Sequence, residues 1–453
     1  MLVFRRRLVF WLLKAYLRKW GKVLFISFVG GLIIFFALLK LSRVLVNVIP
    51  IEEKTTIGVV GAYTLESLPP DIFQKVSIGL TTLSENGTIE KGAASGWEIR
   101  DDGKTYVFTL RDDLKFSDGK KFSSETVSYD FTDVRSETPD DRTLVFKLKD
   151  QYSPFLVTVS RPILQGNLSG LGAYTIDDIV LNGSFIKSLT LVSRENQYKS
   201  LHYLFYPSDE ALKIAFALGE IEEAHGLTHI TFRDTSLETF PNISFTEMTN
   251  YRELVTLFFN NNDGTLSDPK LRKALTYALP NEFSEGERSI IPYPKTSMYA
   301  QSELFELRQD LQHAQVLLDA TESATSEGGL KLTVKTLTKY KNAAETITSE
   351  WKKINVETTI EEVDSIPQTY QIYLGDFTIP KDPDQYTLWH SAQPNNITHY
   401  KNLRIDKLLE DGRKETDPKA RMEIYSDFQR YLLEDSPAAF LYFPYEYRIT
   451  KNK

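Results

Sequence analysis

An uninterrupted apolar run stands near the beginning of the chain. Val23–Leu39 reads VLFISFVGGLIIFFALL and contains no charged side chain. As a helix it covers about 25 Å, slightly less than the ~30 Å hydrocarbon core of a bilayer. Lys22 and Lys40 flank the run and can extend their ammonium groups to the two interfaces. The pattern therefore predicts a transmembrane helix over residues 23–41.

After a linker at 42–56, the pattern alternates between strands and helices. It predicts a strand over 330–336, a helix over 342–354 and a strand over 355–361. Within that helix Ala344, Ile347 and Trp351 fall on one apolar face. Such a βαβ unit implies a parallel strand pair. The other main elements that we expect are strands over 104–111, 143–149, 188–193, 254–260 and 438–443, and helices over 209–218, 269–279, 310–320 and 417–434.

Charge is distributed unevenly along the chain. The net charge is −8, but residues 1–50 hold nine basic residues and no acidic one, so the remaining 44 basic and 61 acidic residues give −17. Seven of the nine precede the apolar run, which places the N-terminus in the cytoplasm and the rest of the chain outside the membrane. Residues 1–22 thus form a basic cytoplasmic segment, of which 8–17 reads as an amphipathic helix on the inner leaflet.

The apolar run has two other interpretations. A cleaved signal peptide would end in a small-x-small site, whereas the run is followed by KLSRVLVNVIP. A buried helix of a soluble protein is the second alternative. We expect an uncleaved single-pass anchor, and whether short trimming follows translocation stays open.

Composition excludes several classes of protein. A chain of 453 residues exceeds what one hydrophobic core usually supports, so at least two lobes are expected. The absence of cysteine excludes disulfides, thiol catalysis, iron–sulfur clusters and a lipidated N-terminal cysteine. The acidic outer part argues against nucleic acid as a partner.

Catalytic and metal motifs are weak. His225 and His229 have a spacing that two metal ligands could share, but Gly226 weakens a helix there and no HExxH occurs. Ser169 lies in GNLSG, which is not GxSxG, and no GxxxxGK[ST] phosphate loop is present. We therefore expect no enzyme activity, no metal and no cofactor.

The outer part carries several motifs in a fixed order. The most specific is residues 94–131, which contain a Trp, an Asp-Asp-Gly-Lys turn, an aromatic strand, Asp-Gly and a helix start. The others are IGLTTLSENG at 78–87, GLGAYTI at 170–176, ALGEIE at 217–222, FFNNNDGTLSDPKLRKALTYA at 258–278, the helix at 310–318, KDPDQY at 381–386 and THYKNLRIDKLL at 398–409. Together they resemble family 5 of the extracellular solute-binding proteins, the oligopeptide and dipeptide receptors of ABC importers, over about residues 54–448.

The resemblance implies a two-lobed α/β fold of the periplasmic-binding-protein type, with a ligand cleft between the lobes. The first lobe would comprise residues 57–257 plus 437–453 and the second 258–436. The implied function is capture of peptides, or of a related small solute, and delivery to the permease of an ABC transporter. The alternative is a surface sensor or adhesion module that reads a ligand on the same fold without delivering it.

The sequence departs from the family's pattern at the ligand site. In peptide receptors of this type an aspartate just before the Asp-Pro-Asp loop pairs with the ligand's α-amine, but Ile379 holds that place here. A ligand with an anionic group therefore stays open as well. The candidate ligand-binding residues are Asp376, Phe377, Lys381, Asp382, Trp389, Tyr400 and Asn261. The alternatives are a solvated loop for the charged residues, lobe packing for the aromatic ones and a polar turn for Asn261.

Overall fold

The computed structural model describes residues 2–48, 52–233, 235–301, 307–321 and 329–452. The chain divides into two units, which are described separately. The smaller comprises residues 1–54 and 196–200, and the larger comprises 55–195 and 201–453.

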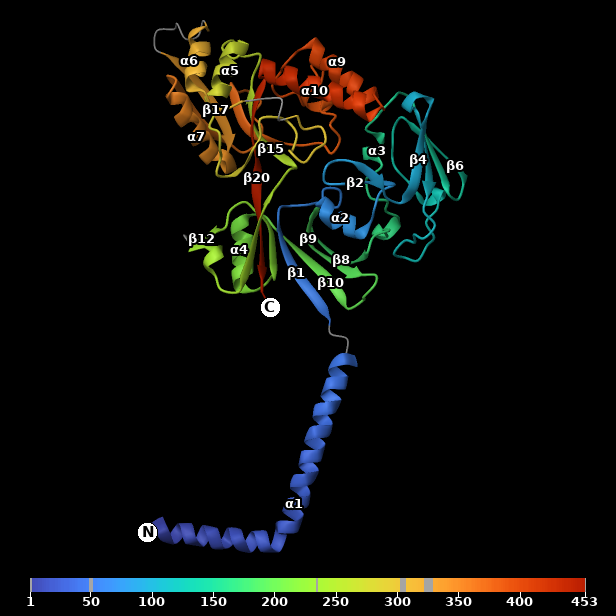
Figure 1. Ribbon diagram of the computed structural model, residues 1–453, viewed down its shortest axis with the longest axis vertical. Coiled ribbons are helices and arrows are strands. Elements are labelled where there is room, and N and C mark those ends of the chain that lie inside the picture. The colour runs from blue at the N-terminus through green and yellow to red at the C-terminus, as the bar shows by residue number, and fades with distance from the viewer. Residues whose placement is uncertain (1, 49–51, 234, 302–306, 322–328, 453) are drawn as a thin grey trace. The chain divides into compact units, whose positions relative to one another are not determined.

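The smaller unit is dominated by one long helix, α1 (Leu2–Val48), which bends in Figure 1. Within its stretch Val9–Lys40, an 18-residue window reaches a mean hydropathy of 2.5, and the large apolar side chains there are exposed. Among the described residues, this is the one helix long and apolar enough to span a membrane. The helix predicted over 23–41 is confirmed, while its crossing of a membrane stays a prediction.

The larger unit is built on a twelve-stranded mixed sheet. Ten strands follow one another in the order β18-β17-β19-β15-β20-β11-β1-β10-β9-β8, while β14 and β16 pair with β20. Their bounds are β1 Glu53–Val60, β8 Tyr174–Asn182, β9 Phe185–Ser193, β10 Lys199–Tyr206, β11 Glu223–Leu227, β14 Ile243–Thr249, β15 Glu253–Phe259, β16 Gly286–Arg288, β17 Leu330–Leu337, β18 Val356–Val363, β19 Ile372–Thr378 and β20 Ala438–Lys451.

Strand β20 lies in the middle of the strand order and joins the two halves of this sheet (Figure 1). Its first half pairs antiparallel with β15 and β16, and its second half pairs with β14 and β11. The apolar residues Ala438–Phe443 are all buried. The predicted strand at 438–443 is thus confirmed but continues for eight further residues.

Three smaller sheets complete the β-structure. The largest has four antiparallel strands in the order β4-β5-β7-β6 and closes over an aromatic core that includes Tyr106, Phe108, Phe146 and Phe155. The other two are the hairpins β2-β3 and β12-β13. The bounds are β2 Thr81–Leu83, β3 Ile89–Lys91, β4 Ala94–Arg100, β5 Thr105–Leu110, β6 Val134–Asp140, β7 Thr143–Leu148, β12 Thr231–Phe232 and β13 Thr235–Ser236.

Helices cover the sheets, and the predicted βαβ unit is confirmed. Strands β17 and β18 are parallel, with Leu330 opposite Val356, and α7 joins them. Trp351 of α7 is fully buried and its indole N–H donates to the Leu275 carbonyl at 2.9 Å. The helix bounds are α2 Pro70–Val76, α3 Phe155–Thr158, α4 Asp209–Leu218, α5 Pro269–Tyr277, α6 Leu311–Asp319, α7 Lys341–Lys352, α8 Tyr386–Trp389, α9 Leu403–Lys414 and α10 Pro418–Asp435.

The buried apolar residues separate along the sequence. Two core clusters draw their buried members from residues 254–443 only. Three others draw theirs from residues 57–237, together with Ile449 of β20. Strand β20 contributes buried side chains to both groups, whereas those of β15 belong to the first group alone.

Candidate functional site

Three of the seven predicted site residues are held in structural contacts. Trp389 is 2% exposed, donates from its indole N–H to the Gln385 side chain at 2.8 Å and packs edge-on against Phe377. Tyr400 is 5% exposed and its hydroxyl donates to the Asp435 carboxylate. Asn261 is half-buried and donates from its side-chain amide to the Phe259 and Thr398 carbonyls at 2.9 and 3.0 Å.

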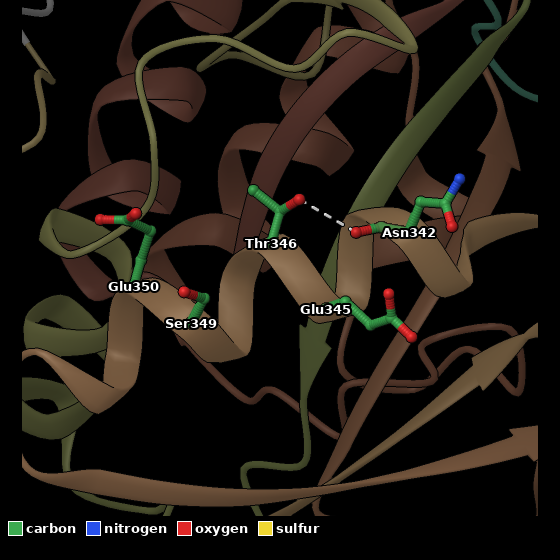
Figure 2. A pocket seen from close by; sticks show the side chains of 5 residues that line it. All are labelled: Asn342, Glu345, Thr346, Ser349 and Glu350. Carbon is green, nitrogen blue, oxygen red and sulfur yellow. Dashed lines mark hydrogen bonds between the residues drawn. The ribbon is translucent and has the colours of Figure 1, made fainter.

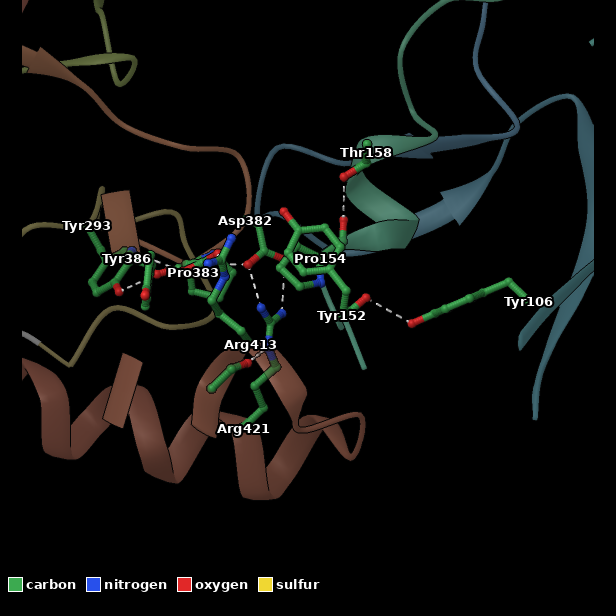
Figure 3. Close-up of polar contacts among 12 residues, drawn as sticks. Tyr106, Tyr152, Pro154, Thr158, Tyr293, Asp382, Pro383, Tyr386, Arg413 and Arg421 are labelled. Carbon is green, nitrogen blue, oxygen red and sulfur yellow. Dashed lines mark hydrogen bonds and ion pairs between the residues drawn. The ribbon is translucent and has the colours of Figure 1, made fainter. Parts of the chain in front are cut away.

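Asp382 forms a buried ion pair. Both of its carboxylate oxygens accept hydrogen bonds from the Arg421 guanidinium, one of them at 3.0 Å (Figure 3), and the two side chains are 8% and 6% exposed. Burial by itself lowers the pKa of Arg421, but the Asp382 carboxylate outweighs this effect and the pKa is raised. Asp382 is thus saturated by a partner within the protein.

Asp376, Phe377 and Lys381 are less buried than Asp382. Asp376 lies near the end of β19. Its carboxylate accepts a hydrogen bond from the Tyr340 hydroxyl at 2.8 Å and forms an ion pair with Lys339 at 3.0 Å. Phe377 is half-buried against the aromatic core. Lys381 is exposed, yet desolvation by the surrounding protein and then the charge of Arg252 lower its pKa.

Sequence reasoning missed two carboxylates, one close to Asp376 and the other close to the first. Glu253 begins β15 and Glu446 lies in the middle of β20; both are half-buried. Desolvation and then the charge of Asp376 raise the pKa of Glu253. Desolvation and then the charge of Glu253 raise the pKa of Glu446, which accepts a hydrogen bond from the Asn250 amide at 2.5 Å. The signal in the sequence was an acidic residue within an aromatic strand, FPYEYR.

An exposed ion pair completes the group. Arg252 lies beside Glu253 and contacts Asp71 of α2 at 2.6 Å. We name these six residues the junction cluster: Asp71, Arg252, Glu253, Asp376, Lys381 and Glu446. The three half-buried carboxylates can stabilise a cationic group such as an ammonium, while Lys381 and Arg252 can meet an anionic one. The arrangement therefore suits a ligand that carries charge of both signs.

The histidine pair is divided between separate partners. His225 contacts Glu223 at 2.8 Å, whereas His229 lies 3.3 Å from Asp209. Burial and then the charge of Arg448 lower the pKa of His225. Across the described ranges of the chain, no three His, Asp or Glu side chains are grouped so as to hold a metal ion.

A surface hollow of about 420 Å³ lies elsewhere, along α7 (Figure 2). Its lining is polar and mostly exposed, and Glu350 within it accepts hydrogen bonds from Gln309 and Lys353, each at 2.6 Å. None of the seven predicted site residues lines it; the lining residues are Asn342, Glu345, Thr346, Ser349 and Glu350.

Comparison with known proteins gives a consistent family. The family model described as "Bacterial extracellular solute-binding proteins, family 5 Middle" matches residues 88–399. The probable D,D-dipeptide-binding periplasmic protein DdpA of Escherichia coli is 22% identical, with 81% of each chain covered. The oligopeptide-binding protein OppA of Bacillus subtilis is 23% identical over 83% of this chain and 84% of its own.

Solved structures share the architecture. NikZ from Campylobacter jejuni, in complex with Ni(L-His), superposes with a TM-score of 0.71 at 20% identity and covers 88% of this chain and 94% of its own. AppA from Bacillus subtilis, in complex with a nonapeptide, gives 0.66 at 20% identity, with 88% and 95% covered. These likenesses show the two-lobed α/β fold that the sequence predicted.

Proposed function

The chain belongs to family 5 of the bacterial extracellular solute-binding proteins, and from this premise we propose that it is a membrane-anchored receptor that captures peptides between its lobes for an ABC importer. The family match over residues 88–399 carries the proposal. It is supported by three of the four proteins named above, whose descriptions give binding of a D,D-dipeptide, oligopeptides or a nonapeptide, whereas the fourth, NikZ, was solved with Ni(L-His). The relatives are solute receptors and not enzymes.

We assign the lobes as residues 57–257 plus 437–453 and 258–436. The separation of the core clusters along the sequence supports a division into two lobes, although the buried apolar residues at 254–257 and 438–443 pack in the clusters of the second lobe. Under it, the junction cluster stands where the chain passes between the lobes, and its members come from both.

Within the site, Glu253, Asp376 and Glu446 receive the ligand's ammonium group. Their half-buried carboxylates repel one another, so a cation relieves an unfavourable charge. Lys381 and Arg252 meet the ligand's carboxylate, and Phe377 packs against its side chains. Asp382, Trp389 and Tyr400 support the scaffold, because they are buried and their polar groups have partners in the protein, and the Asn261 amide is likewise held by two backbone carbonyls.

The ligand is tested directly. The full-length protein is purified in detergent and denatured, and the released small molecules are identified by mass spectrometry. Thermal shifts are then measured with peptides of two to nine residues and, separately, with nickel and histidine. Release of peptides together with peptide-specific shifts is expected. Absence of both would exclude peptide binding, and shifts with nickel and histidine alone would identify a metal-complex receptor instead.

Anchoring is a separate part of the proposal. The helical stretch Val9–Lys40 has 32 residues, more than the roughly 20 that a bilayer requires, and the basic residues before its uncharged run Val23–Leu39 favour a cytoplasmic N-terminus. The full-length protein should remain in membranes after alkaline extraction, whereas a variant lacking residues 2–48 should not. Detection of a mature N-terminus beyond Arg43 would show instead that the segment is a signal sequence.

A further inference from the structure

The last turn of α9 contacts the segment that follows the four-stranded sheet. The Arg413 carbonyl accepts a hydrogen bond from the Ser153 backbone N–H at 2.7 Å. The Arg413 guanidinium carbon lies 5.3 Å from the ring centre of Tyr152 and 4.3 Å from that of Tyr386 (Figure 3). A guanidinium between two aromatic rings gains attraction from both ring faces.

Both partners are fixed within their own parts of the protein. The Arg413 Nε lies 2.9 Å from the Asp384 carboxylate, which is 9% exposed. On the other side, the Tyr152 carbonyl accepts a hydrogen bond from Tyr106 at 3.1 Å, and Tyr106 belongs to the core of the four-stranded sheet. A continuous chain of contacts therefore leads from the Asp-Pro-Asp loop to that sheet.

The contact is also linked to the junction cluster. Lys381 directly precedes Asp382, which is held by Arg421 of α10. The Arg421 Nε donates in turn to the carbonyl of Gly412, the residue before Arg413, at 2.9 Å. The loop that carries Lys381 and the end of α9 are thus fastened to the same helix, so a displacement at Arg413 reaches Lys381 through two short connections.

We propose that Tyr152 and Arg413 form an interlobe latch that holds the four-stranded sheet against α9 and α10. The exposed Arg252–Asp71 ion pair joins two residues of the first lobe, so it does not link the lobes. Arg413 is 29% exposed and contacts Tyr152 of the first lobe together with Tyr386 and Asp384 of the second.

The absence of cysteine permits a clean measurement on the full-length chain in detergent. Ser136→Cys on β6 and Glu423→Cys on α10 introduce two exposed labelling positions on opposite sides of the latch. Nitroxide labels there report the distance between the two parts by pulsed electron paramagnetic resonance. The parent chain should give one narrow distance distribution, and Arg413→Gln should broaden it toward longer distances.

Arg404→Gln is the matched control. Arg404 lies in the first turn of the same helix, and its guanidinium carbon is 4.4 Å from the ring centre of Tyr431 on α10. Its loss removes a similar stacking contact within one lobe and should leave the distribution unchanged. Tyr152→Leu should reproduce Arg413→Gln, and the double variant should add nothing to either single change.

Two outcomes would overturn the latch: an unchanged distribution in Arg413→Gln, or equal broadening in Arg404→Gln. A general loss of folding is recognised by thermal unfolding of each labelled variant, where Arg413→Gln should melt within a few degrees of the parent chain. The measurement needs no ligand. It therefore decides the latch even where the peptide proposal fails.

Discussion

Asp376 and Asp382 stand six residues apart in the sequence, yet the fold gives them different tasks. Asp382 is paired with Arg421 in the interior, whereas Asp376 is half-buried, pairs with Lys339 and lies near the Glu253 carboxylate. A buried carboxylate with a bidentate guanidinium partner has little capacity left for a ligand. The difference depends on Arg421 and Glu253, which are remote from both residues along the chain.

Removal of the Asp382 carboxylate tests its structural role. Asp382→Asn leaves Arg421 as an uncompensated buried charge, so the free energy of unfolding should fall by about 3–5 kcal/mol. Equilibrium denaturation measures it, with Asp411→Asn as the control, because the Lys407–Asp411 pair is exposed and should contribute little. Unchanged stability combined with lost ligand binding would instead identify Asp382 as a ligand contact.

The raised pKa of Glu253 predicts how the stability of the protein changes with pH. Below the ordinary glutamate pKa of 4.5 the side chain is protonated in both the folded and the unfolded protein, so its ionisation does not lower the free energy of unfolding. As pH rises through the raised folded pKa, the folded protein must hold a charge that burial and Asp376 disfavour, and stability is lost. Glu253→Gln should therefore stabilise the ligand-free protein at neutral pH, by up to about 1 kcal/mol, and not at pH below 4.

The same substitution should weaken ligand binding, because it removes a carboxylate that we propose binds the ligand's ammonium group. Glu247→Gln is the control, since Glu247 is exposed on the neighbouring strand β14. Thermal unfolding at several pH values and peptide titration measure the two effects. A loss of stability in Glu253→Gln at neutral pH would contradict the proposed strain.

At the scale of elements, local signals in the sequence set several boundaries. The helix predicted over 209–218 is α4 with the same limits, because Ser208 caps its first turn and Gly219 adopts a left-handed φ of 81° at its end. Strand β14 was not predicted. Four of its seven residues are exposed, and its position depends on pairing with β20, nearly two hundred residues away. A local pattern cannot report a partner at that separation.

Helix α10 offers a test of such a local signal. The Asp417 carboxylate accepts hydrogen bonds from the Lys419 and Ala420 backbone N–H groups at 3.1 and 2.9 Å, and Pro418 occupies the first helical position. Asp417→Ala should reduce the free energy of unfolding by about 1 kcal/mol. Glu423→Ala, at an exposed interior position of the same helix, should not reduce it. Equal losses in both variants would show that capping is not the cause.

At the scale of the whole molecule, both halves of the large sheet depend on the single strand β20. It supplies buried side chains both to the clusters of residues 254–443 and, through Ile449, to a cluster built from residues 212–237. Neither group of cores is complete without a segment that lies at the far end of the sequence.

Truncation before Pro437 should therefore unfold both parts of the protein. The loss of six buried residues at 438–443, at several kcal/mol for each large one, exceeds the 5–15 kcal/mol that stabilises an ordinary domain. Circular dichroism and limited proteolysis should show unfolding of the whole outer part, whereas removal of residues 452–453 alone should leave it folded. A protease-resistant fragment covering residues 57–250 after the longer truncation would refute this dependence.

The sequence by itself determined the apolar helix, the parallel βαβ unit, the two-lobed α/β class and the family, because each depends on local periodicity or on motifs in a fixed order. It also directed attention to the Asp-Pro-Asp loop. Only the tertiary structure decided which residues of that region stay available. Burial and pairing are properties of neighbours in space. Arg421 pairs with Asp382, Asp435 binds the Tyr400 hydroxyl, and the fold brings Glu253 beside Asp376 and Glu446 beside Glu253.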